Sequence, residues 1–230
     1  MQMPQYVLDR VSGKRGRQHV FDALDPRVTA LMVTDMQNAF VKGKVKADAA
    51  VAVMPTINRL ARELRDMGGI VAWVQLQAGN PDGSSVAELY HKYFFTPEGA
   101  EAHRSSLTPG EWGFELCEEL EVLEGDIRSV KTRHSAFVPG HSDLHEQLRA
   151  RGIENLLIGG TVTNFCCETS ARDAMMLDYR VVMVSDCNAA RFEEDHLNGL
   201  TTVFQSFGDV YDTDETIAVL KRGQTEGNRP

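Results

Sequence analysis

The sequence predicts an α/β protein of three layers, in which helices cover both faces of a central, mostly parallel six-stranded sheet. Apolar runs of strand length alternate with longer amphipathic segments along the chain. The run at residues 29–34 (TALMVT) is continuously apolar, which is typical of a strand buried on both faces. A chain of 230 residues, 42% of them apolar, is long enough for one compact domain.

Each element is expected from a local pattern. The first helix has apolar positions at Val51, Met54, Ile57 and Leu60, spaced by three and four residues, and it stops near Gly68. The patterns leave the strand order open, except that the ends of the first, third and fourth strands should meet. Strands are expected at residues 29–34, 70–76, 126–130, 155–158, 180–185 and 209–211, and helices at residues 48–67, 142–151, 165–177, 193–207 and 214–221.

A single domain is expected over residues 28–222, after an N-terminal arm (1–27) and before a disordered tail (223–230). Residues 78–125 form an irregular insertion, and a long insertion usually makes a lid or an interface. Its aromatic residues favour a homo-oligomer, a dimer or tetramer. Rings that cover the protein's own pocket would explain them as well. These residues are Tyr90, Tyr93, Phe94, Phe95, Trp112 and Phe114.

Composition excludes several classes of partner. The chain has 24 basic and 33 acidic residues, a net charge of −9, and no basic stripe for nucleic acid or an anionic membrane. No apolar run reaches the roughly 18 residues of a membrane span, and the N-terminus lacks the apolar core of a signal peptide. We therefore expect a cytoplasmic protein. Its four cysteines have neither the spacing of a zinc finger nor the number of a disulfide scaffold.

Three polar residues follow predicted strands, at the sheet edge where α/β proteins bind ligands. They are Asp35, Lys131 and Cys166. A cysteine at a helix start and near a lysine should have a lowered pKa, and a carboxylate can serve as its general base. Each residue also has an ordinary structural explanation, as a turn cap, a solvated strand end or a small buried side chain.

Three segments, in the same order, resemble motifs of the isochorismatase-like cysteine hydrolase superfamily. Residues 33–40 (VTDMQNAF) resemble its D-x-Q-N-x-F motif, residues 131–137 (KTRHSAF) its K-x-x-x-S-x-F motif, and residues 160–174 (GTVTNFCCETSARDA) its G-x-x-T-x-x-C-V-x-x-T-x-x-D-A motif. The resemblance implies an isochorismatase-like fold with Cys166 as nucleophile, Asp35 as base and proton shuttle, and Lys131 as the residue that tunes and orients them.

The same resemblance implies a non-proline cis peptide bond between Val162 and Thr163 and an oxyanion hole made by the N–H groups of Val162 and Cys166. Cys167 is a departure, because the family commonly has valine there. We assign catalysis to Cys166 because it lies three residues after Thr163, as in the motif.

The resemblance also indicates a branch of the superfamily. Nicotinamidases have an Asp-x-His metal site after the second strand, and residues 73–79 (WVQLQAG) have no such ligands. We therefore expect no metal and no cofactor, and we interpret His91 and His103 as surface or lid residues. Isochorismatases proper lack the cysteine. The most similar branch acts on small ureido and carbamoyl compounds (ureidoacrylate amidohydrolase, biuret and triuret hydrolases, N-carbamoylsarcosine amidase), which implies a thioester intermediate and release of ammonia.

A small urea-like substrate needs fixed polar groups and compact walls. The candidates are Asn38, His134 and Gln205 for polar contacts and Phe40, Trp112 and Phe137 for walls, although the aromatic rings fit core packing equally well. Other functions stay open. They are hydrolysis of nicotinamide or another small amide or imide, vinyl-ether hydrolysis with Asp35 as acid, and redox sensing by the adjacent pair Cys166 and Cys167.

Overall fold

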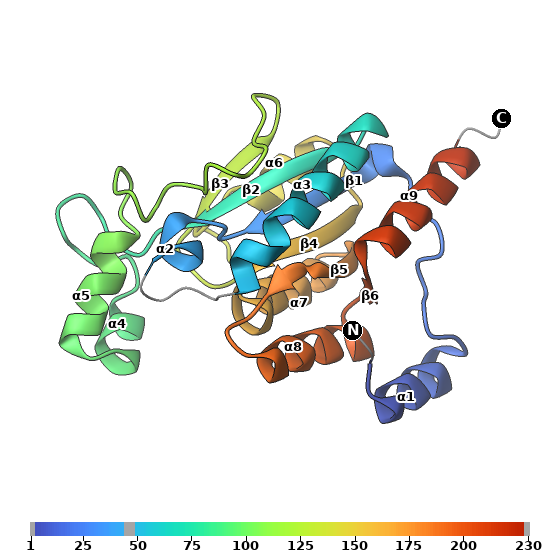
Figure 1. Cartoon of the computed structure of the whole chain (residues 1–230), viewed down its shortest axis with the longest axis horizontal. Helices are drawn as coiled ribbons and strands as arrows, with labels where there is room; N and C mark the ends of the chain where they lie inside the picture. Colours follow the sequence, from blue (N-terminus) through green and yellow to red (C-terminus); the bar gives the residue numbers. More distant parts are fainter. Residues whose placement is uncertain (1–2, 44–48, 228–230) are drawn as a thin grey trace.

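The computed structural model describes residues 3–43 and 49–227 and confirms the α/β prediction (Figure 1). Six strands form one sheet in the order β3-β2-β1-β4-β5-β6, and every pair of neighbours is parallel. The strands are β1 (Thr29–Thr34), β2 (Ile70–Leu76), β3 (Ile127–Lys131), β4 (Asn155–Thr161), β5 (Arg180–Ala189) and β6 (Asp209–Tyr211).

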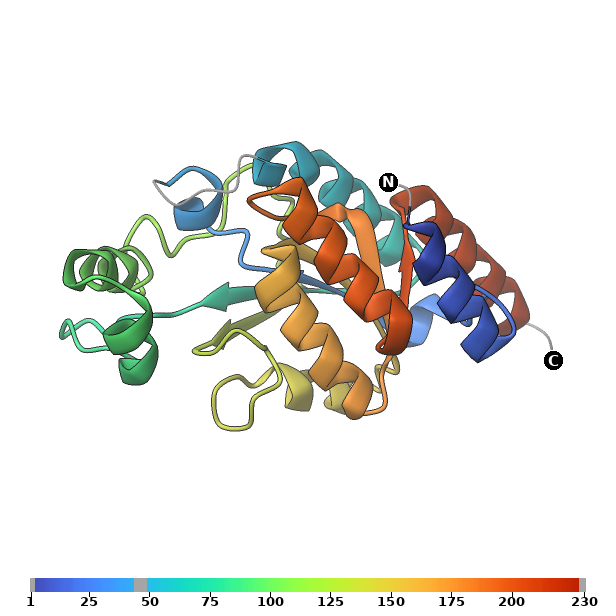
Figure 2. The same ribbon diagram turned by 90° about the horizontal axis from the view of Figure 1, so that it is seen from below.

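Helices cover both faces of this sheet (Figure 2). One face packs against α3 and α9, and the other packs against α1, α6, α7 and α8. The α-helices are α1 (Gln5–Arg15), α2 (Asn38–Val41), α3 (Ala49–Asp66), α4 (Glu88–Phe94), α5 (Pro97–Ser106), α6 (Leu144–Ala150), α7 (Glu168–Met176), α8 (Glu193–Ser206) and α9 (Thr213–Gly227), with a 3-10 turn η1 (Pro26–Val28) and a π-helical turn η2 (Thr163–Cys167).

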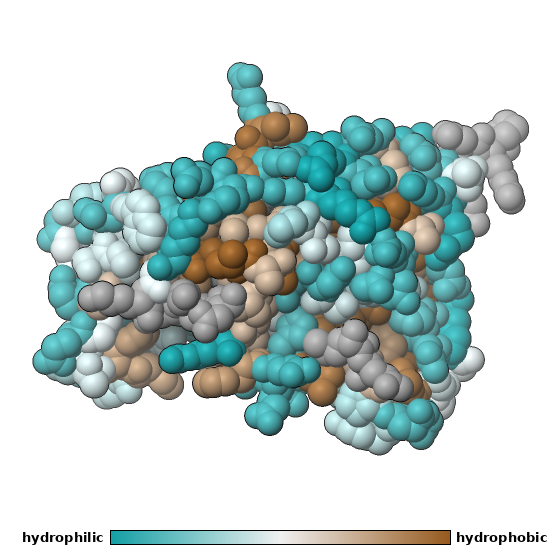
Figure 3. Space-filling view, in the orientation of Figure 1, coloured by the Kyte–Doolittle hydropathy of each residue, from teal (hydrophilic) through white to brown (hydrophobic). Residues whose placement is uncertain are grey.

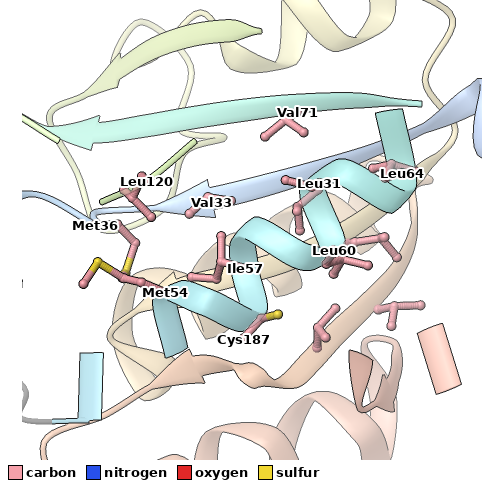
Figure 4. Packing of buried hydrophobic residues seen from close by; sticks show 14 of the residues in the cluster. Leu31, Val33, Met36, Met54, Ile57, Leu60, Leu64, Val71, Leu120 and Cys187 are labelled. Atoms are coloured by element: carbon pink, nitrogen blue, oxygen red, sulfur yellow. The ribbon is translucent and has the colours of Figure 1, made fainter. Parts of the chain in front are cut away.

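The predicted apolar stripe of α3 forms the core on its side of the sheet from Met54 to Leu64 (Figure 4). Val51 is 49% exposed, so the prediction is wrong for this position. Ile57, Leu60 and Leu64 are fully buried and belong to the same apolar cluster as Leu31 and Val33 of β1 (Figure 4). The alternate residues of β1 face the opposite layer. A strand with both faces covered needs a continuous apolar run, which is the pattern observed at residues 29–34.

The strand order places the two central strands, β1 and β4, at the point where the chain changes direction across the sheet. Ligands of open α/β sheets bind outside the carboxyl ends of the strands at such a point. Gly160 of β4 has φ 111°, and a side chain there would overlap the backbone of Thr34. Glycine therefore permits the close approach of these strands beside the ligand position.

Both ends of the chain differ from the prediction. The N-terminal arm contains α1, whose Val7 and Val11 are buried in the core beside α8. Arg15 fixes this helix through an ion pair of 3.2 Å with the buried Asp209. At the other end α9 continues to Gly227, so the disordered-tail prediction is wrong for residues 223–227. The rest of the predicted tail (228–230), the first two residues of the arm and Asp48, the predicted first residue of a helix, are not among the described residues.

The insertion at residues 78–125 contains α4 and α5, neither of which the sequence patterns predicted. Both helices lie at one end of the molecule, at the left of Figure 1, beyond the carboxyl ends of the strands. Ala78 donates a hydrogen bond of 3.0 Å to the carbonyl of the buried Leu107, which closes the insertion at its base.

The face shown in Figure 3 is mostly hydrophilic, with apolar patches between the polar side chains. Over residues 3–43 and 49–227, none of the helices has the length and apolarity needed to cross a bilayer.

Candidate active site

The structure brings the three predicted catalytic residues together at the carboxyl edge of the sheet. Asp35 follows β1, Lys131 ends β3, and Cys166 lies in η2 directly after β4. Lys131 Nζ lies 2.8 Å from Asp35 Oδ2 and 3.3 Å from Cys166 Sγ. One ammonium group therefore contacts both the carboxylate and the thiol, although the three residues are far apart in the sequence.

Backbone contacts hold the carboxylate in place. Asp35 has a φ of 55°, a left-handed conformation that aspartate adopts more readily than most residues. Its N–H donates to the carbonyl of Val74 at 2.8 Å, and Thr161 Oγ1 donates to its carbonyl at 3.1 Å. Contacts from β2 and β4 thus fix the residue between these strands.

The contacts of Gln37 explain the glutamine of the D-x-Q-N-x-F motif. Its buried side-chain amide donates to the carbonyls of Leu76 and Phe114 at 3.0 and 2.9 Å, and its Oε1 accepts from the N–H of Leu76 at 2.8 Å. The glutamine therefore joins the loop after β1 to the end of β2 and to the insertion.

The buried charges set the protonation states. Burial lowers the pKa of Lys131, but the interactions with Asp35, first, and with Cys166 outweigh this effect, and the pKa is raised. Burial, and next the charge of Asp35, raise the pKa of the Cys166 thiol to about 12 against the opposing effect of Lys131. The predicted lowering of this pKa is therefore wrong. The thiol is protonated at neutral pH, so its attack on a carbonyl requires a base in the same step.

His134 lies beside the thiol. Its Nδ1 is 3.6 Å from Cys166 Sγ. The ring stacks on Phe165, with centroids 5.9 Å apart, and meets Tyr90 edge-on at 5.1 Å. Burial, followed by the charge of Lys131, lowers the pKa of His134. Its imidazole is therefore neutral at neutral pH.

Two cavities lie beside His134 and beside the loop at residues 161–167 that carries Cys166, called the cysteine loop below. The larger has a volume of about 900 Å³, and Val162 and Phe165 from the cysteine loop form part of its wall. The smaller, of about 120 Å³, is bordered by His134. Tyr90 and His103 of the insertion border both cavities. The space open to a ligand thus lies between the cysteine loop and the insertion.

Three of the six predicted substrate-binding residues border a cavity, one positions a neighbouring loop, and two lie elsewhere. Phe40 and Trp112 border the large cavity and His134 borders the small one. Asn38 has a positioning contact, because its side-chain amide donates to the carbonyl of Trp112 at 2.9 Å.

Phe137 and Gln205 were predicted wrongly. Phe137 is buried in the core, with its ring 5.8 Å from that of Tyr179. Gln205 lies in the last turn of α8, where its amide donates to the carbonyl of Thr201. The cysteine loop contacts α8 at Gly199, and Gln205 lies six residues, about 9 Å along the helix axis, beyond that contact.

The non-proline cis peptide bond joins Thr161 and Val162, not Val162 and Thr163 as predicted. The position is wrong by one residue because the motif marks the cysteine and the threonine but carries no signal for the geometry of a particular peptide bond. The cis bond thus lies at the junction of β4 and η2.

A chain of hydrogen-bonded polar residues in the insertion was missed. Ser85 Oγ lies 2.5 Å from His91 Nδ1, and His91 Nε2 lies 2.9 Å from His103 Nδ1. Both histidines belong to the predicted lid region, but His91 is only 4% exposed, so a surface position is wrong for it. The contact joins α4 to α5, and two histidines twelve residues apart give no signal of it. Within residues 3–43 and 49–227 we find no group of three or more His, Cys, Asp or Glu side chains arranged to hold a metal ion.

The histidine pair predicts an acid-sensitive contribution to stability. Burial, then the neighbouring His91 and His134, lower the pKa of His103 to about 4. An unfolded histidine titrates near pH 6.5. Between pH 6.5 and 4, His103 therefore binds a proton in the unfolded chain but not in the folded chain. The free energy of unfolding is therefore lost as the pH falls through this window, by about 2 kcal/mol for this group at pH 4.5.

His103→Gln is expected to reduce the difference in unfolding free energy between pH 7 and pH 4.5 by that amount. Urea denaturation at the two pH values measures it, with His145→Gln as the matched control outside the insertion. An equal drop in the wild type and in His103→Gln would contradict the expectation.

Comparisons with known proteins agree with the geometry. The isochorismatase domain model matches residues 29–215. The chain is 31% identical to the ureidoacrylate amidohydrolase RutB of Cronobacter sakazakii over 80% of this chain and 88% of that protein. Among solved structures, a cysteine hydrolase from Pseudomonas syringae pv. phaseolicola superposes with a TM-score of 0.76 at 28% identity, covering 87% of this chain and 95% of the other.

The N-carbamoylsarcosine amidase of Thermoplasma acidophilum gives a TM-score of 0.64 at 27% identity, covering 81% of this chain and 96% of the other. The family model spans most of the chain, including every strand of the sheet and the three residues that meet at its edge. The chain is therefore a member of the isochorismatase family.

Proposed function

We propose that this protein is a cysteine-dependent amidohydrolase that cleaves a C–N bond of a small linear ureido or carbamoyl compound. The observation that carries the proposal is the contact of one buried ammonium, Lys131 Nζ, with both Asp35 and Cys166. A buried ion pair beside a thiol provides a base, a nucleophile and a positive charge within one site. The similarity to a ureidoacrylate amidohydrolase and to an N-carbamoylsarcosine amidase supports the class of substrate.

In the first step Cys166 attacks the carbonyl carbon of the substrate while its proton passes to Asp35. The amide R–CO–NH₂ then loses ammonia, which takes this proton as it leaves, and R–CO–S–Cys166 remains. Lys131 stays protonated throughout and limits the cost of negative charge on the sulfur and the carboxylate. A concerted proton transfer fits a thiol whose pKa is about 12.

The carbonyl oxygen gains negative charge during this attack and needs hydrogen-bond donors. We assign this role to the N–H groups of Val162, which lies between β4 and η2, and of Cys166, which lies in η2. Water then attacks the thioester, which releases R–COOH and restores the thiol.

The larger cavity has room for a substrate larger than urea itself. Its walls combine the rings of Phe40, Trp112 and Phe165 with the polar groups of the cysteine loop. Aromatic walls with a few polar groups are typical of small-molecule sites. The linear ureido and carbamoyl compounds differ in length and charge, and contacts in this cavity would distinguish them.

An ammonia-release assay tests the proposal with ureidoacrylate, biuret, triuret, N-carbamoylglycine and N-carbamoylsarcosine, beside nicotinamide. Isochorismate is tested in parallel by pyruvate release, because hydrolysis of its vinyl ether produces no ammonia. We expect turnover of at least one ureido or carbamoyl compound and its loss after thiol alkylation. Turnover confined to isochorismate, or unaffected by alkylation, would overturn the proposal.

A further inference from the structure

We propose that His134 is a further catalytic residue, the base that activates water for hydrolysis of the acyl-enzyme. The inference rests on the proposed function, because it concerns the second half of the same reaction. Asp35 serves the first half, in which the thiol must lose its proton. His134 serves the second, in which a water molecule must lose one.

Two acid–base groups lie close to the sulfur. Lys131 Nζ, paired with Asp35, lies 3.3 Å from Cys166 Sγ, and His134 Nδ1 lies 3.6 Å from the same atom. An acyl group on this sulfur would place its carbonyl carbon one bond from Sγ. The imidazole nitrogen is therefore within reach of a water that attacks this carbon.

Access to the site distinguishes the two groups. The side chains of Lys131 and Asp35 are 0% and 2% exposed, and neither they nor Cys166 are among the residues that border the two cavities described above. His134 borders the small cavity. Water that enters after the first product has left thus meets His134 before it meets the carboxylate.

The ring is also held in a fixed position. Phe165 stacks on one face, and the edge contact with Tyr90 of α4 completes the clamp. Nδ1 is the ring nitrogen that faces the sulfur. The lowered pKa of His134 keeps the imidazole neutral at neutral pH, and Nδ1 accepts a proton in the tautomer that carries its hydrogen on Nε2.

Hydrolysis of the acyl-enzyme requires one proton to pass from water to the sulfur. His134 Nδ1 takes a proton from water as the oxygen forms a bond to the acyl carbon of R–CO–S–Cys166. The C–S bond then breaks, the electron pair stays on the sulfur, and the imidazolium returns its proton to the thiolate. The products are R–COOH and the Cys166 thiol, with His134 again neutral. One nitrogen near both the water and the sulfur performs both transfers.

The test compares wild type with His134→Gln and with His134→Phe, which retains a ring against Tyr90 and Phe165. His145→Gln is the matched control, because His145 pairs with Tyr179 outside the site. The substrate is the compound of the panel above with the highest wild-type turnover. Both His134 variants should lose about 100-fold in kcat while kcat/KM, which reports acylation, changes little, so KM falls as well. Mass spectrometry of acid-quenched enzyme should show acyl-enzyme accumulating in these variants.

Hydroxylamine separates a catalytic role from a structural one. It attacks thioesters without a general base, so it should restore turnover in the His134 variants and release the hydroxamate R–CO–NHOH. A parallel loss of kcat and kcat/KM without acyl-enzyme, or unchanged kcat in both variants, would overturn the inference and leave the proposed function intact. Inactivity of the wild type on the whole panel would overturn both.

Discussion

Cys166→Ala is expected to lower turnover of the ureido or carbamoyl substrate by about 10⁴-fold or more. Without the sulfur no acyl-enzyme forms, and Asp35 and Lys131 have no nucleophile to serve. Cys166→Ser should be almost as inactive, because a hydroxyl is a weaker nucleophile than a thiol and is harder to deprotonate. Steady-state ammonia release measures both. The circular dichroism spectrum should match that of the wild type, since each change removes or replaces one atom.

The chain supplies a matched control at the next position. Cys167 is fully buried among apolar residues of α7 and the sheet, and its Sγ lies 4.0 Å from the carbonyl of Gly159. Burial raises the pKa of its thiol well above the ordinary value. Cys167→Ala should keep most of the activity. Equal losses in the two alanine variants would contradict the assignment of the nucleophile.

Lys131→Met is expected to abolish activity and to lower the free energy of unfolding by about 3–5 kcal/mol. The side chain of Lys131 is 0% exposed, and its loss would leave the Asp35 carboxylate buried without its counter-charge. Urea denaturation at pH 7 measures the change, with Lys14→Met on the exposed face of α1 as the control.

A double variant distinguishes the contribution of the ion pair to the free energy of unfolding from that of side-chain packing. Asp35→Asn combined with Lys131→Met removes both charges, so it should be more stable than Lys131→Met alone while remaining inactive. A double variant less stable than Lys131→Met would contradict this electrostatic explanation.

The sequence predicts the sheet well because each strand has a local signal. The apolar runs at residues 29–34 and 70–76 coincide with β1 and β2. The observed β5 runs to Ala189, beyond the apolar run at 180–185, because a register shift between Ile158 and Gly160 lets it continue beside β4. Such irregular pairing depends on the neighbouring strand and leaves no mark in the segment itself.

The site was predictable where a residue has a fixed place in a motif and unpredictable where it depends on tertiary contact. Asp35 and Cys166 follow β1 and β4, and Lys131 ends β3, so the parallel sheet places all three at one edge. The prediction for Gln205 was wrong because α8 carries its last turn away from this edge of the sheet. The raised pKa of Cys166 was missed because burial outweighs the nearby ammonium, and burial at one atom cannot be inferred from its neighbours in the sequence.

The most direct test of the central claim is to locate the acyl group on the enzyme during turnover. Wild-type protein mixed with the best substrate, quenched in acid and digested, is analysed by tandem mass spectrometry, which distinguishes Cys166 from Cys167. We predict the acyl group on Cys166, in the wild type and in Cys167→Ala, and none in Cys166→Ala. An acyl group on Cys167, or full turnover by Cys166→Ala, would contradict the account.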